Sequence, residues 1–169
     1  GVLDHRSVLV QPRNEVVYFD GNEARAVHVE SLEDRPLFRL PEDREPIGQN
    51  GYTPDGRRFV YIDAPRGSQY GEPCRGAKVV VYDFASGRQQ VLCTIDAAID
   101  HVVAYDNEHF IFSHPHKATG MMMTDLQSGR WVRLREGDPG VEGSVIHFQM
   151  TDRGIAYEAP PGIFAGLYD

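Results

Sequence analysis

The sequence predicts an all-β protein, and within that class a β-propeller built from four-stranded antiparallel blades. Short runs of branched and aromatic residues alternate with Gly, Asp, Asn and Pro, and helical periodicity is nearly absent. The same order of strands and turns recurs, with first strands near residues 7, 48, 100 and 145. Units of about 40 to 50 residues with four strands each are typical of propeller blades. A sandwich or barrel of irregular strands is the alternative.

A recurring turn strengthens the prediction of a propeller. The third strand of the second unit runs into VYDFASGR (residues 81–88), and that of the third unit into MTDLQSGR (residues 123–130). The first unit carries the looser version VHVESLED (residues 27–34). Asp, Ser and Gly in this order favour a tight turn. The recurrence of one turn at one place in the unit is expected of repeated blades.

The predicted strands can be read off in chain order. The first unit reads SVLVQP, NEVVYFDG, ARAVHVESLED and RPLFRL, and the second reads GQNGYTPDGR, RFVYIDAP, AKVVVYDFASGR and QQVLCTI. The third reads DHVVAYDNE, HFIFSHP, MMMTDLQSGR and WVRLRE, and the fourth GSVIHFQMTDRG, IAYEAP and IFAGLYD. The methionines of the MMM run are expected in a blade core.

These units are predicted to be blades of a single propeller segment, residues 1–169, at approximately 5–43, 46–97, 98–137 and 143–169. The insert APRGSQYGEPCRG of the second unit is expected to be a loop. The fourth unit has no outer strand, so the sequence holds about three and a half blades of a probable seven, an incomplete ring. Either the chain is a fragment or another chain completes the ring, as a homo-oligomer would.

Composition excludes several classes of partner. The net charge is −8, and only Lys78 and Lys117 among the 17 cationic residues are lysines, so we expect no nucleic-acid partner. No apolar stretch approaches the roughly 20 residues that span a bilayer, so no membrane partner is expected. Cys74 and Cys93 lack metal-type spacing. We expect two reduced thiols in a cytoplasmic protein, with a disulfide between them as the alternative. A periplasmic location stays open.

Cationic side chains are predicted to converge at one end of the blades. In a four-stranded meander, the start of strand one, the end of strand two and the start of strand three share an end. His101 opens strand one of the third unit, His114 closes its strand two, and His147 lies near the start of strand one in the fourth. Arg75 precedes strand three of the second unit. Structural, hydrogen-bonded histidines are the alternative.

Other histidines are expected to have blander roles. His109 falls at the opposite end of its blade and is interpreted as a solvated turn residue. His116, in the His-Pro-His run that begins at His114, lies beyond the strand and is interpreted as a loop residue. The candidate site is therefore expected at the end of the third blade where its first strand begins.

Along nearly its whole length the chain resembles the oligogalacturonate lyases, seven-bladed propellers that degrade unsaturated pectin disaccharides. AKVVVYDFASGRQQVL followed by IDHVVAYDNEHFIFSHP is similar to the family's strand, SG-type turn, Gly-His-Pro segment and Phe-Cys-His segment. RNEVVYFDGNEARAVHVESLEDRPLFRLPED resembles one of its earlier blades, and VEGSVIHFQMTDRGIAYEA its Thr-His-Glu-Phe-Trp segment. The resemblance lies in the order and spacing of these segments.

The resemblance implies a set of site residues. His101 takes the place of the catalytic base, Arg75 that of the arginine that assists it, and His114 that of a histidine at the rim of the site. His147 takes the place of a ligand of a divalent metal, typically manganese, and no organic cofactor is implied. The implied partner is an acidic oligosaccharide, an oligogalacturonide.

The sequence also departs from the family pattern. Asp100 and Val102 replace the glycine and proline around His101, Ser113 replaces a cysteine, and Phe148-Gln149 replaces Glu-Phe after His147. The family's Gln-x-x-His-Pro-His ligand motif of a late blade is missing from this sequence.

Two functions follow as expectations. The first is a lyase of the oligogalacturonate type, performing metal-assisted β-elimination on an unsaturated uronate disaccharide and inactive as this chain alone. The second is a non-catalytic propeller that binds a protein or sugar partner, because propellers host many functions. A propeller attached to a hydrolase is disfavoured, since no Gly-x-Ser-x-Gly motif is present.

Overall fold

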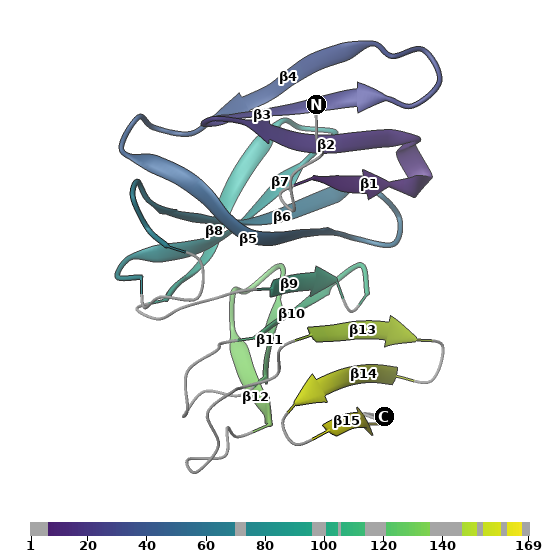
Figure 1. The fold of residues 1–169 in the computed structure, drawn as a ribbon, viewed down its shortest axis with the longest axis vertical. Helices are drawn as coiled ribbons and strands as arrows, with labels where there is room; N and C mark the ends of the chain where they lie inside the picture. Colours follow the sequence, from purple (N-terminus) through teal and green to yellow (C-terminus); the bar gives the residue numbers. More distant parts are fainter. Residues whose placement is uncertain are drawn as a thin grey trace.

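The computed structural model describes residues 7–69, 74–95, 101–104, 106–113, 121–135, 147–151, 154–159 and 162–166. In this part of the chain, strands account for nearly all regular structure, together with one 3-10 turn at Gln11–Arg13. The strands form four antiparallel meanders in chain order, which make up three sheets because the second and third meanders are joined (Figure 1). We call the four meanders blades 1 to 4. The described residues contain no α-helix of the length and apolarity needed to cross a membrane.

The strand bounds of the four blades are as follows. Blade 1 comprises β1 (Val8–Val10), β2 (Glu15–Asp20), β3 (Glu23–His28) and β4 (Asp34–Arg39). Blade 2 comprises β5 (Arg44–Tyr52), β6 (Arg58–Pro65), β7 (Ala77–Asp83) and β8 (Arg88–Ile95). Blade 3 comprises β9 (His101–Ala104), β10 (His109–Ser113), β11 (Met121–Asp125) and β12 (Trp131–Arg135). Blade 4 comprises β13 (His147–Thr151), β14 (Gly154–Ala159) and β15 (Gly162–Gly166).

Within each blade, consecutive strands pair antiparallel in chain order. The first strands of successive blades lie beside one another, β1 next to β5, β5 next to β9, and β9 next to β13. A parallel pairing of Gln49 with His101 joins β5 to β9, so blades 2 and 3 form one eight-stranded sheet. The predicted all-β propeller of antiparallel blades is thereby confirmed, with blade 4 showing three strands among its described residues.

Blade 2 is buried on both faces, which explains its near-continuous apolar strands. Phe59 and Tyr61 of β6 pack against blade 1, in a cluster that includes Val10 and Val17. The alternating residues of the same strand face blade 3 and pack in a second cluster with Val102, Phe110 and Leu126. Because successive side chains of a strand point to opposite faces, one strand serves two interfaces.

The recurring turn has the same geometry in three blades. The amide of Gly87 donates to the carbonyl oxygen of Asp83 at 2.8 Å, and that of Gly129 to the carbonyl oxygen of Asp125 at 2.9 Å. The Asp83 carboxylate accepts the Ser86 amide at 2.7 Å and the Ser86 hydroxyl at 2.8 Å, and these bonds lower the pKa of Asp83. The acidic residue therefore organises the turn rather than serving only as a solvated cap.

Blade 1 builds the same turn from different residues. The Leu32 amide donates to the His28 carbonyl oxygen at 2.9 Å, and the Ser31 amide donates to Nδ1 of His28 at 3.2 Å. His28 thus stands where blades 2 and 3 have aspartate, and Leu32 stands where they have glycine. Leu32 adopts φ +56° with its side chain 74% exposed.

Replacing Leu32 by glycine is expected to stabilise the protein. A side chain in the left-handed region costs about 1–2 kcal/mol, and the extra chain entropy of glycine offsets part of it, leaving a gain of about 0.5–1 kcal/mol. Denaturant unfolding of Leu32→Gly measures the gain. Val29→Gly in the same turn, where φ is negative, is the control and is expected to lose stability; equal losses in both variants would contradict the prediction.

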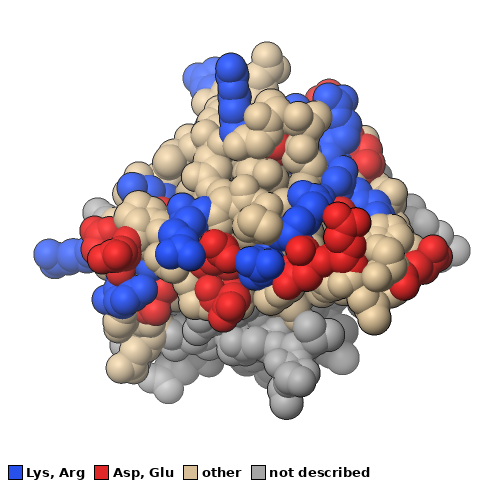
Figure 2. Space-filling model, turned by 90° about the horizontal axis from the view of Figure 1, so that it is seen from above, with Lys and Arg blue, Asp and Glu red and all other residues tan. Residues whose placement is uncertain are grey.

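The face of blade 1 that points away from blade 2 carries a network of ion pairs. Arg25 contacts Glu23 at 2.6 Å and Asp34 at 3.2 Å, and Arg39 contacts Glu23 at 3.0 Å. Seen from the blade 1 end, basic and acidic side chains are interspersed (Figure 2). Exposed pairs of this kind contribute little stability each, and in the single chain they give blade 1 a charged outer face.

Candidate functional site

The backbone register places the predicted histidine positions at one end of neighbouring strands. His101 begins β9, where it pairs with Ser113, the last residue of β10, and with Gln49 of β5. His147 begins β13, which lies beside β9, and it pairs with Glu158 of β14. β9 and β13 run in the same direction (Figure 1), so their first residues lie at the same end of the blades. His114 and His116 lie outside the described residues.

Arg75 lies at the same end of blade 2, in the loop that enters β7. Its side chain is exposed. The residue before it, Cys74, is buried, with its sulfur 3.1 Å from the hydroxyl of Ser68 on the outgoing side of the loop. The residue after it is Gly76, at φ +74°. An exposed guanidinium is thus presented from a backbone that is fixed on one side and tightly turned on the other.

Arg75 and His101 lie at the same end of the propeller but at different depths along the inner strands. Arg44, which faces Pro65 at the edge of blade 2, begins β5, whereas His101 pairs with Gln49, five residues further along β5. Five strand residues span up to about 16 Å. Arg75 therefore lies near the rim of this end, and the backbone of His101 lies deeper along the inner strands. Sequence order predicted the shared end but carried no information on depth.

No group of three or more His, Cys, Asp or Glu residues that could hold a metal ion occurs among the described residues. The arrangement that comes nearest is at the opposite end of blade 3, where Nδ1 of His109 lies 2.9 Å from Asp106 and Nε2 lies 3.9 Å from Asp125. His109 lies at the end of the blade opposite His101, as the sequence predicted. Its ring contacts Asp106 in the turn before β10 and Asp125 at the end of β11. Burial raises the pKa of the Asp106 carboxyl group. The hydrogen bond with the His109 ring and those from the Glu108 and His109 amides outweigh this effect, so the pKa is lowered overall.

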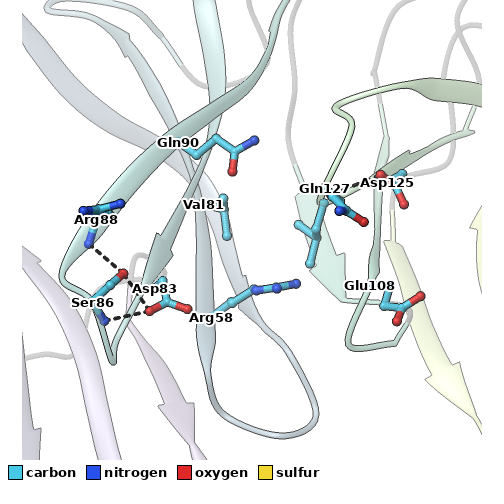
Figure 3. A pocket seen from close by; sticks show the side chains of 10 residues that line it. Arg58, Val81, Asp83, Ser86, Arg88, Gln90, Glu108, Asp125 and Gln127 are labelled. Carbon is cyan, nitrogen blue, oxygen red and sulfur yellow. Dashed lines mark hydrogen bonds between the residues drawn. The ribbon is translucent and has the colours of Figure 1, made fainter.

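A cleft of about 620 Å³ opens between blades 2 and 3, at the end opposite Arg75. Its apolar floor is formed by Val81 and Leu126. Gln90 and Arg58 extend from blade 2 toward blade 3, and Gln127 and Glu108 line the cleft on the blade 3 side (Figure 3). Its other lining residues are Asp83, Ser86, Arg88 and Asp125.

Two recurring turns frame this cleft, one from each blade. The repeat of VYDFASGR and MTDLQSGR was a signal that neighbouring blades would bring equivalent turns side by side. The cleft itself was missed, because sequence spacing does not show how far two blades diverge. Hydrogen bonds join blades 2 and 3 at this end. The Asp55 amide donates to Oδ1 of Asn107 at 2.9 Å, and the Arg58 guanidinium donates to the carbonyl oxygen of Asn107 at 3.1 Å.

Comparison with solved structures shows the fold. The chain superimposes on an oligogalacturonate lyase in complex with manganese with a TM-score of 0.74 and 16% identity, covering 93% of this chain and 47% of that one. An oligogalacturonate lyase from Vibrio parahaemolyticus gives 0.70 and 17%, covering 90% and 45%. A chain of a nidogen/laminin complex gives 0.62 and 11%, covering 92% and 62%. The predicted resemblance is confirmed at the level of the fold.

The chain spans about half the length of the two lyases that it matches. No family model and no curated protein matches the sequence. One structural neighbour carries manganese, and another belongs to a protein–protein complex. At these identities the likeness shows the fold alone.

Proposed function

We propose that this chain contributes the uronate-binding end of a lyase-type β-propeller. The observation that carries the proposal is that His101 and His147 begin neighbouring inner strands at the end of the blades where Arg75 is exposed. The likeness to two oligogalacturonate lyases along 90% or more of the chain supports it. The ligand would be an acidic oligosaccharide, an oligogalacturonide.

For Arg75 and His101 to act on one uronate, the long Arg75 side chain would have to span the difference in depth between the rim and His101. In that arrangement the two residues have complementary roles. The guanidinium of Arg75 binds the uronate carboxylate and offsets its negative charge, because a planar fork of donors matches two carboxylate oxygens. This makes the C5 proton more acidic. His101 takes that proton, the C5–H electrons form a C4–C5 double bond, and the C4–O bond breaks, with the departing oxygen taking up a proton. An imidazole suits this task because it is partly neutral near pH 7.

We also propose His147 as one ligand of a divalent metal, manganese in the first instance. A bound ion of this kind would supply further charge to the uronate carboxylate. The described residues provide no cluster that could complete the site. One histidine binds such an ion weakly, so the remaining ligands must come from outside the described residues. A second copy of the chain that completes the ring would be one source, and the chain alone is then inactive.

Elemental analysis of the purified protein, together with its solution mass by light scattering, tests this proposal. We expect about one divalent ion per assembled ring, in a dimer or larger species, and loss of the ion in His147→Ala. In that species, His101→Ala is expected to reduce the rate of elimination from unsaturated digalacturonate by about 10²–10⁴-fold. His109→Ala, at the opposite end of the same blade, is the control. A metal-free monomer without elimination would contradict the lyase assignment.

The alternative is a non-catalytic module that binds a protein or sugar. The cleft between blades 2 and 3 favours it, because Gln90, Gln127 and Glu108 present polar groups around an apolar floor there. A metal-free protein that binds a partner through this cleft, with affinity lost in Gln127→Ala and retained in Arg75→Ala, would support this second function over the first.

A further inference from the structure

The start of β5 holds a buried ion pair beneath the loop that carries Arg75. Nε of Arg44 donates to Oδ1 of Asp63 at 2.8 Å, and the two side chains are only 12% and 10% exposed. Asp63 lies in β6, opposite Pro46. A buried arginine needs its remaining donors satisfied, so the other contacts of its guanidinium show what this pair supports.

The second arm of the guanidinium reaches the backbone on two sides. Nη2 of Arg44 donates to the carbonyl oxygen of Asp63 at 2.7 Å and to that of Gly76 at 3.0 Å. Gly76 directly follows Arg75. One side chain therefore joins β5, β6 and the entrance of β7, and it fixes the peptide between Gly76 and Ala77, one residue after Arg75.

The outgoing half of the same loop is held by the neighbours of Arg44. The Arg66 amide donates to the carbonyl oxygen of Asp43 at 2.8 Å, and the Gly67 amide donates to Oε1 of Glu45 at 2.7 Å. The contact between Cys74 and Ser68 joins the two halves of the loop. Both halves are thus anchored on the three consecutive residues 43–45 at the start of β5. The exposed Arg75 side chain is the functional group that this anchoring presents.

We propose that Arg44 is a positioning residue, which acts through Arg75 to set the carboxylate-binding group of the site. This inference rests on the proposed function for the role of Arg75, whereas the anchoring itself stands on the contacts above. Lysine is not equivalent to Arg44, because all its donors are on one nitrogen, whereas Arg44 bonds Asp63 and Gly76 from two nitrogens, Nε and Nη2, held in a rigid plane.

Hydrogen exchange of the full chain tests the anchoring without any assay of activity. In Arg44→Lys, the amides of Arg66 and Gly67 and the peptide covering residues 74–77 are expected to exchange about tenfold faster or more. Arg44→Met is the second variant. Arg35→Met, which removes a 2.7 Å ion pair to Glu15 in blade 1, is the matched control and leaves this loop unchanged. Unchanged exchange in Arg44→Lys would overturn the proposal.

Calorimetric titration with unsaturated digalacturonate tests the coupling to Arg75. Loss of a charged hydrogen-bonding group in Arg75→Ala is expected to weaken binding about ten- to a hundredfold. Arg44→Lys is expected to weaken it severalfold. If Arg44 acts only through Arg75, then Arg44→Lys/Arg75→Ala binds no more weakly than Arg75→Ala alone, whereas a general structural role gives additive losses.

The two experiments separate the failures. Wild-type affinity in Arg44→Lys, or additive losses in the double variant, would overturn the positioning role. Wild-type affinity in Arg75→Ala, or no binding by the wild-type chain, would overturn the proposed function and with it the role of Arg44 in that site. In that case the exchange data still report whether the loop is anchored by Arg44.

Discussion

Phe59→Ala is expected to lower the free energy of unfolding by about 3–5 kcal/mol, the usual cost of truncating a fully buried aromatic side chain. Phe59 is 0% exposed and lies between β6 and blade 1. Its ring centroid is 5.8 Å from that of Tyr61 and 6.2 Å from that of Phe19. The cavity would open at the interface of two blades, where neither sheet can move without losing its other contacts.

Phe84→Ala is the matched control for this prediction. Phe84 is half-buried at the edge of the same cluster, with the guanidinium of Arg13 4.3 Å from its ring centre. Its removal leaves a dent open to water instead of a closed cavity, so the expected cost is about 1–2 kcal/mol. Urea unfolding of both variants measures the difference. Equal costs would show that the interface between blades 1 and 2 collapses around the missing ring.

The central position of blade 2 links this core to the candidate site. Residues of β6 that face blade 1 form one cluster, and the alternating residues form the other with blade 3. β6 ends at the loop that leads to β7 and carries Arg75. It also supplies Asp63, which pairs with Arg44. The site end of the propeller is therefore built on a blade that is packed on both faces, which favours a fixed geometry for a binding group.

The sequence predicted the fold because its signals are local. Alternating apolar residues and the motif ending in Ser-Gly-Arg each specify one strand or one turn, and the structure confirms the hydrogen bonds of that turn around Asp83 and Asp125. The looser version in blade 1 was recognised by position alone. That His28 Nδ1 takes over the acceptor role of the aspartate follows only from the structure.

What the sequence could not predict depends on contacts between distant residues. Arg44 is one of many arginines in the chain, and its bonds to Asp63 and Gly76 join residues 19 and 32 positions away. The cleft requires the angle between two blades, and the depth of His101 requires the register of β9 on β5. The roles of His101, Arg75 and His147 stay predictions from the resemblance, while His114 lies outside the described residues.

The two ends of the blades therefore have different characters. The end with Arg75 is held by long-range contacts of β5. The end with the cleft combines short-range turns, whose aspartates accept nearby amides, with the bonds of Asn107 to blade 2. A binding group that must face a charged ligand gains from the first kind of support. The turns of the second end serve mainly to pack one blade against the next, and Gly129 shows this most clearly.

Gly129→Ala is expected to destabilise the protein by about 3–5 kcal/mol, well beyond the effect of the same change in the equivalent turn. Gly129 has φ +67°, so any side chain there is strained. In addition, a Cβ at this position would overlap the carbonyl oxygen of Leu92 in β8, an atom of the backbone of blade 2. The turn of blade 3 could admit the methyl group only by moving away from blade 2.

Gly87→Ala separates the two causes, because Gly87 occupies the same place in the turn of blade 2. Its φ of +68° gives the same strain, but a Cβ there meets only the hydroxyl of Tyr82, at 3.9 Å. We therefore expect a cost of about 1–2 kcal/mol, the strain alone. Urea unfolding at pH 7 compares the variants. Equal losses would mean that blades 2 and 3 separate at this point without cost, and that the cleft between them is readily widened.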